Sequence, residues 1–246
     1  MTSSNRPPAE TGKKQARTPD RTSAAGDVAA FLDRVKQIAP RTGAGRGRLI
    51  FAMDATMSRQ PTWDMALALQ GDMFAAVDEV GGLDVQLVYF RGLGECKASK
   101  WVGDTKALAR LMTGVSCQGG YTQIARVLSH ARQASEKARV NAVVYVGDCM
   151  EESVDELCAT AGELGLLGTP VFMFQEGNEP AAESAFREIA RLSGGAWCRF
   201  DAGAASQLRD LLRAVAVYAA GGHKALADLS EKDGGAGARL LLEQLR

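Results

Sequence analysis

The sequence predicts an α/β domain with a Rossmann-like, doubly wound and mostly parallel sheet that has helices on both faces. Two observations predict this fold class. Short apolar runs alternate with longer segments in which apolar residues recur at helical spacing, as in chains built from β-α-β units. Two of these runs stop abruptly at a carboxylate, Asp54 and Asp148, and ligands of such folds gather beyond the carboxyl ends of the strands.

Composition narrows the class of protein. The chain has 246 residues and 46% hydrophobic residues, enough for a substantial core. Lys+Arg and Asp+Glu both number 29, so net charge favours neither nucleic acid nor a membrane surface as a partner. The five cysteines are scattered without a CxxC pair, and the N-terminus lacks an apolar leader segment. We therefore expect a cytoplasmic protein with free thiols.

We divide the chain into a tail, a linker region, a domain and a second tail. Residues 1–25 are rich in Ser, Thr, Pro and basic residues and are expected to be disordered. Residues 26–44 should form a helix that ends at Pro40, followed by a glycine-rich linker; this linker precedes a strand and lacks GK[ST], so it is no phosphate loop. The domain spans 45–220. In the tail, 221–246, the leucines either form a short docking helix or pack back on the domain.

Six apolar runs are the predicted strands. They cover residues 49–54, 85–90, 95–102, 143–146, 170–175 and 195–200. The third run follows the second after a tight Gly92-Leu93-Gly94 turn with no helix between them, so it should be an antiparallel edge strand. With the common order 3-2-1-4-5-6, strands 1 and 4 are neighbours at the topological switch point.

The intervening segments predict helices. They cover residues 61–80, a short stretch capped by Asp104, a stretch after Thr122, a stretch from 154 to about 164, and 181–192 and 206–219. Glycine pairs at 81–82 and 221–222 should end the first and the last of these helices.

The end of the first strand carries a set of oxygen side chains. Asp54, Thr56 and Ser58 alternate along the chain, and the predicted strand order brings Asp148 to the same edge of the sheet. A donor set of carboxylates and hydroxyls without nitrogen or sulfur suits a hard cation. The sequence therefore predicts a Mg²⁺ site at this edge.

These residues resemble a known pattern. Asp54-x-Thr56-x-Ser58, followed by Thr122 after a glycine pair and by Asp148 after an apolar strand, resembles the von Willebrand factor A (VWA) domain family and its metal-ion-dependent adhesion site (MIDAS). That pattern is DxSxS, a distant Thr and a distant Asp. The resemblance covers about residues 45–220. Thr56 departs from the commoner serine but keeps the hydroxyl.

The resemblance implies a role for each residue. Thr56 and Ser58 would ligate Mg²⁺ directly, and Thr122 directly or through water. Asp54 and Asp148 would act largely through bridging waters or hydrogen bonds. Mn²⁺ or Ca²⁺ would be substitutes for Mg²⁺.

It also implies a function that is recognition and not catalysis. The Asp or Glu of a protein partner would complete the metal shell, with Arg59, Arg91 and Tyr121 as candidates for contacts at the rim. Intracellular VWA proteins often work in multiprotein complexes, and some are paired with AAA+ ATPases. We therefore expect a non-enzymatic module that binds another subunit of a complex.

Three alternative interpretations of these residues remain open. Each of the five residues alone could be a turn residue or helix cap. Gly147-Asp148 with Glu151 and Glu152 partly matches a haloacid-dehalogenase-like phosphatase that would use Asp54 as nucleophile. However, Thr56 stands where such enzymes carry their general acid, and the inserted cap domain is missing. A third reading is a scaffold with a vestigial metal site.

Other catalytic groups find little support. His130 and His223 lie by no nucleophile motif, and Cys149 reads best as a buried small residue.

Overall fold

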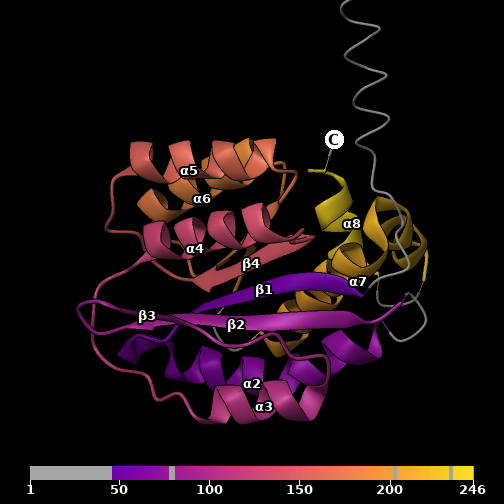
Figure 1. Cartoon of the computed structure of the whole chain (residues 1–246), viewed down its shortest axis with the longest axis horizontal. Coiled ribbons are helices and arrows are strands. Elements are labelled where there is room, and N and C mark those ends of the chain that lie inside the picture. The colour runs from indigo at the N-terminus through magenta and orange to yellow at the C-terminus, as the bar shows by residue number, and fades with distance from the viewer. Residues whose placement is uncertain (1–45, 78–80, 202–203, 233–234, 246) are drawn as a thin grey trace, which may run out of the picture. The chain divides into compact units, whose positions relative to one another are not determined.

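The computed structural model describes residues 46–77, 81–201, 204–232 and 235–245. The predicted tail over 1–25 and the whole region over 26–44, with its helix, lie outside the described residues. Element labels are those of Figure 1.

The sheet has six strands in the order β3-β2-β1-β4-β5-β6, which confirms the predicted topology. All neighbouring strands are parallel except β2 and β3, which are antiparallel. The strands are β1 (Gly47–Asp54), β2 (Leu83–Arg91), β3 (Glu95–Ala98), β4 (Ala142–Gly147), β5 (Val171–Glu176) and β6 (Trp197–Phe200).

The edge strand β3 is shorter than the stretch 95–102 that the sequence predicts. The hydroxyl of Ser99 accepts a hydrogen bond from Leu87 N, where a regular ladder would offer a backbone carbonyl. Regular pairing therefore ends at Ala98, and the chain returns for an isolated antiparallel bridge between Val102 and Val85.

The helices follow the predicted order. They are the 3-10 helix η1 (Met57–Arg59), α2 (Gln60–Ala75), α3 (Thr105–Thr113), α4 (Ile124–Lys137), α5 (Val154–Leu166), α6 (Pro180–Ser193), α7 (Ala205–Ser230) and α8 (Ala236–Leu242). Helix α2 ends at Ala75, short of the predicted limit at residue 80. None of the described helices is both long and apolar enough to cross a bilayer.

Two helical layers sandwich the sheet. Helices α4, α5 and α6 lie on one face, and α2, α3 and α7 lie on the other (Figure 1). Strand β1 divides its buried side chains between the layers: Leu49, Phe51 and Met53 pack on the α2 and α7 side, and Ile50 and Ala52 on the α4 side. This continuous apolar run is what a parallel strand covered on both faces requires.

The last long helix corrects one prediction. We expected Gly221-Gly222 to end it, but α7 runs on to Ser230 across a kink at Gly222, whose φ is 70°. Glycine adopts this conformation without strain, so the helix changes direction instead of stopping. The continuation buries Leu226 and Leu229 in the same core cluster as Leu241 of α8.

The exposed edge of β6 is covered from the C-terminal segment. The side-chain amide of Gln244 accepts a hydrogen bond from Trp197 N at 2.8 Å and donates one to Trp197 O at 2.8 Å. One side chain thus takes both positions that a neighbouring strand would occupy at this residue.

The C-terminal packing can be tested on neighbouring leucines. Leu241 is fully buried, whereas Leu240 is 50% exposed. Leu241→Ala should lower the free energy of unfolding by about 2–4 kcal/mol, because it opens a cavity in the core. Leu240→Ala should change it by less than about 0.5 kcal/mol. Urea titration of both variants measures the difference, and equal effects would contradict the packing described here.

Candidate metal centre

Three loops meet at the carboxyl end of the sheet. Strands β1 and β4 are parallel neighbours, with Met53 opposite Val146, so Asp54 and Asp148 leave the sheet at the same edge. The loop before α4 joins them, because Gln118 N donates to Ala55 O at 3.0 Å. Tyr121 N donates to Gly92 O at 3.3 Å and so ties the β2–β3 turn to the same assembly.

The loop after β1 is pinned by its own aspartate. Thr56 N donates to Asp54 Oδ1 at 2.7 Å, which folds the backbone over the carboxylate as an Asx turn. The turn brings Thr56 Oγ1 within 3.5 Å of Ser58 Oγ. Two of the three predicted hydroxyls thus lie side by side, with Thr56 buried and Ser58 exposed.

Two carboxylate oxygens at this edge have no partner. Asp54 Oδ2 and Asp148 Oδ1 are buried, and neither accepts a hydrogen bond. Burial, reinforced by the negative charge of Asp148, raises the pKa of Asp54 to about 6 despite the hydrogen bond from Thr56 and the positive charge of Arg59. A buried carboxylate oxygen without a partner is unfavourable, and a cation with its water shell would satisfy both.

The donor set therefore fits a hard cation. Carboxylate and hydroxyl oxygens are what Mg²⁺ prefers. Among the described residues no group of three or more His, Cys, Asp or Glu could hold a metal ion. A site here would accordingly depend on the hydroxyls of Thr56 and Ser58 as well as on the two aspartates.

Thr122 is held against the loop after β4. Its backbone N donates to Glu151 Oε2, and its hydroxyl accepts from Glu151 N, both at 3.1 Å. This reciprocal pair joins the threonine to the same loop as Asp148, but Thr122 makes no hydrogen bond to the other four predicted ligands. Its hydroxyl proton and second lone pair remain available.

The structure gives Glu151 and Glu152 a different role from the phosphatase motif considered in the sequence analysis. Glu152 accepts hydrogen bonds from Ile124 N and Ala125 N, the first amides of α4. Helix α4 has neither an acidic residue in its first turn nor a side-chain cap of its own, and this distant carboxylate takes that place. Both glutamates thus bond to backbone at the start of α4, which accounts for the partial phosphatase pattern. The lack of a capping side chain at the start of α4 was the one sequence signal that could have indicated a cap from a distant residue.

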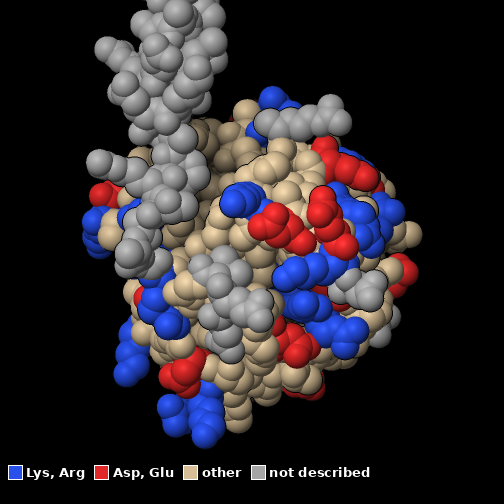
Figure 2. Space-filling model, turned by 90° about the vertical axis from the view of Figure 1, so that its right-hand side faces the viewer, with Lys and Arg blue, Asp and Glu red and all other residues tan. Residues whose placement is uncertain are grey.

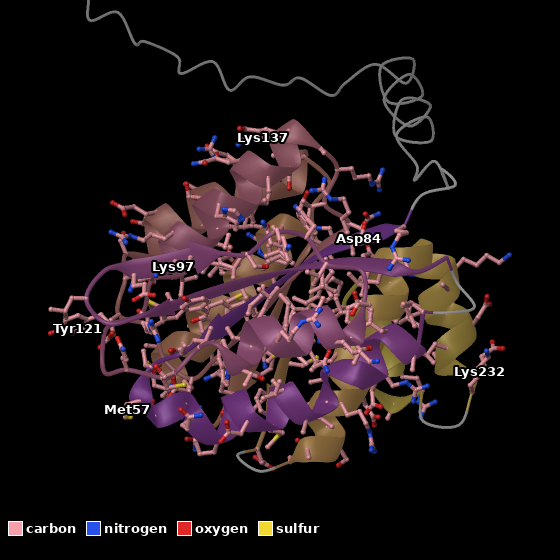
Figure 3. The ribbon with its side chains drawn as sticks, turned by 60° about the horizontal axis from the view of Figure 1, so that its bottom comes forward. Met57, Asp84, Lys97, Tyr121, Lys137 and Lys232 are labelled. Atoms are coloured by element: carbon pink, nitrogen blue, oxygen red, sulfur yellow. The ribbon has the colours of Figure 1, made fainter. Side chains whose placement is uncertain are left out.

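The three rim candidates differ in their contacts. Arg59 forms ion pairs with Asp148 at 3.0 Å and with Glu176 at 2.5 Å, and Arg91 pairs with Glu95 at 3.1 Å. Tyr121 is 62% exposed, and Figure 3 shows its side chain projecting from the same end of the ribbon as that of Met57. Sequence reasoning missed Glu176, because nothing in the sequence links the end of β5 to Arg59.

Two further candidates, Cys149 and His130, are both half-buried, although the sequence analysis predicts a buried Cys149. Burial, with the charge of Asp148, raises the pKa of the Cys149 thiol to about 12, so the thiol stays protonated at neutral pH. The Nε2 atom of the His130 ring lies 2.9 Å from Oε1 of Gln86, a residue of strand β2.

The raised pKa of Asp54 predicts a pH dependence of the metal-free protein. The unfolded chain ionises this group near 3.8 and the folded protein near 6, so its contribution to stability is lost as pH rises from about 4 to 6. In Asp54→Asn, which keeps the Oδ1 acceptor, the loss is absent. Between pH 4 and pH 7, the free energy of unfolding of the variant should therefore rise by about 2–3 kcal/mol relative to that of wild type.

Urea unfolding in chelator at both pH values measures this gain, with Asp155→Asn as a matched control on an exposed aspartate. A difference between Asp54→Asn and wild type that does not change with pH would contradict the assignment.

No protein-family model and no curated protein matches the chain. Solved structures do. PTMP1 from the mussel byssus, in a structure with a zinc-occupied MIDAS motif, is similar at 15% identity and a TM-score of 0.61 over 79% of this chain and 53% of that chain.

Two further structures match nearly over their whole length. The SpRpn10 VWA domain has 10% identity and a TM-score of 0.55 over 67% of this chain and 94% of its own. An aerotolerance-related membrane protein from Bacteroides fragilis has 17% identity and a TM-score of 0.53 over 68% and 96%. Together with the strand order, these likenesses show that the chain has the fold of a VWA domain.

Proposed function

We propose that the chain is a metal-dependent protein-binding module. Mg²⁺ is held at the carboxyl end of the sheet by Asp54, Thr56, Ser58, Thr122 and Asp148, and it binds an Asp or Glu side chain of a protein partner. One observation carries the proposal. Two buried carboxylate oxygens without partners belong to the same edge of the sheet as a pair of neighbouring hydroxyls.

The chemistry of the residues supports recognition by a carboxylate. Mg²⁺ takes about six oxygens and gives up its waters reluctantly. Neutral hydroxyls from Thr56, Ser58 and Thr122 would leave the dication only partly neutralised, while Asp54 and Asp148 would hold its waters. Such an ion attracts an external carboxylate, and a partner's acidic side chain would supply it.

The comparisons support a divalent ion. The similar structure of PTMP1 is described with zinc in its MIDAS motif, which supports metal binding in this fold without deciding the metal. We propose Mg²⁺ because all five donors are oxygens, with Mn²⁺ or Ca²⁺ as substitutes.

We propose that the partner is a subunit of a cytoplasmic complex, for which an AAA+ ATPase is one candidate. The five cysteines are all free, which suits a reducing compartment. The balanced net charge favours neither nucleic acid nor a membrane surface, and the face in Figure 2 carries basic and acidic side chains interspersed. Tyr121 and Met57, each 62% exposed, offer apolar contacts beside the metal.

A non-catalytic role is part of the proposal. Glu151 and Glu152 bond to the backbone at Thr122 and the start of α4, so they are engaged away from the acid–base work that a phosphatase would need. Thr56 cannot replace a general acid near neutral pH.

Calorimetric titration with Mg²⁺ tests the site. Wild type should bind one ion, Asp54→Ala should abolish binding, and Ser58→Ala should weaken it about tenfold or more, because each removes an oxygen donor. Thr160→Val is the matched control: its hydroxyl on α5 bonds to Glu156 O, away from the site, and its loss should leave binding unchanged.

Two outcomes would contradict the proposal. Wild type that binds no Mg²⁺, with or without an added carboxylate, would favour a scaffold with a vestigial site. Turnover of a generic phosphate ester that is lost in Asp54→Ala would favour the phosphatase.

The recognition step has its own test. Immobilised wild type should retain a protein from native lysate in Mg²⁺ and release it in chelator, because the metal bridges the two proteins. Asp54→Ala should not retain it under either condition. Retention that is indifferent to both the chelator and the substitution would contradict a metal bridge.

A further inference from the structure

We propose that Arg59 is a built-in counter-charge of the metal centre, which lowers the affinity of the site for its divalent ion, and that Glu176 limits this effect. The inference rests on the proposed metal site and goes beyond it. It assigns a function to two residues outside the five predicted ligands, on the basis of contacts that the sequence does not reveal.

The guanidinium of Arg59 contacts two of the proposed ligands. Its Nη2 lies 3.0 Å from Asp148 Oδ2, and its Nε lies 3.4 Å from Ser58 Oγ. The side chain is only 13% exposed, so water screens its charge poorly. A fixed positive charge in this position must repel a dication that binds the same aspartate.

Arg59 also determines which oxygen of Asp148 is free. It takes Oδ2 and leaves Oδ1 buried without a partner. The carboxylate is therefore shared: one oxygen belongs to the guanidinium, and the other remains for the metal or for a water bound to it.

Glu176 holds Arg59 in place from the other side. It lies at the carboxyl end of β5 and is only 7% exposed, and it bonds to Arg59 Nη1 and to the hydroxyl of Thr62. Its negative charge offsets the guanidinium, so the repulsion felt by the metal is the part that Glu176 does not cancel.

The net charge of this group attracts a divalent ion. Three carboxylates, those of Asp54, Asp148 and Glu176, accompany one guanidinium, that of Arg59. Two negative charges remain in this group. Without Arg59 the excess would be three, and without the charge of Glu176 it would be one.

These charges predict opposite effects of two substitutions. Arg59→Gln should tighten Mg²⁺ binding about tenfold, because it removes a poorly screened positive charge. Glu176→Gln, which keeps an acceptor for Thr62, should weaken binding about tenfold, because it leaves the guanidinium uncompensated. A purely structural role for the Arg59 pairs would make both substitutions weaken binding.

Calorimetric titration of the full chain with Mg²⁺ measures these affinities, and thermal unfolding in chelator shows that each variant is folded. Arg59→Lys keeps the charge and should stay within about threefold of wild type. Arg132→Gln is the matched control: Arg132 is also ion-paired, to Glu136 and Glu163, but contacts none of the proposed ligands, so affinity should not change. If one of the two glutamine variants does not fold, the Mg²⁺ affinity of the other one tests the proposal.

The failures are distinguishable. Arg59→Gln with unchanged or weaker affinity, or Glu176→Gln with unchanged or tighter affinity, would overturn the counter-charge while leaving the metal site intact. Absence of Mg²⁺ binding in wild type would overturn the proposed function itself.

Discussion

The convergence of two carboxylates at the ends of adjacent parallel strands is the constraint on which this end of the molecule depends. Strands β1 and β4 bring Asp54 and Asp148 to one edge, where Asp54 is buried and the Asp148 side chain is 24% exposed. Each carboxylate finds a partner for one oxygen, Thr56 N for Asp54 and Arg59 for Asp148, and neither finds one for the other. The fold thus maintains a local excess of negative charge, as the proposed cation site requires.

The loops around this edge are connected by hydrogen bonds from one to the next. The loop after β1 binds the loop before α4 through Ala55 and Gln118, and the latter binds the loop after β4 through Thr122 and Glu151. The ion pairs of Arg59 extend the connections to the end of β5 at Glu176. Side chains from three strand ends, those of β1, β4 and β5, and from the loop before α4 are therefore positioned as a unit, which is the preorganisation that a precise oxygen shell needs.

The sequence predicted the strands and the aspartates at their ends because apolar runs that stop at a carboxylate are local signals. The strand order was assumed as the common arrangement among the few that right-handed crossovers allow, and the structure confirms it. It failed where distant packing overrides a local signal. Gly221-Gly222 reads as a helix end, yet burial of Leu226 and Leu229 continues the helix beyond the kink. The cap of α4 by Glu152 and the pairing of Arg59 with Glu176 join residues far apart in sequence, and no periodicity encodes such contacts. The five predicted ligands themselves stay a prediction.

The Gln244 amide has a consequence for how this protein meets other chains. Its side-chain amide occupies the backbone hydrogen-bonding positions of Trp197, so an added peptide strand cannot pair with β6 at this residue. The opposite edge strand, β3, has only four residues and carries the charged Lys97. Recruitment of an extended segment alongside the sheet is thereby discouraged on both flanks.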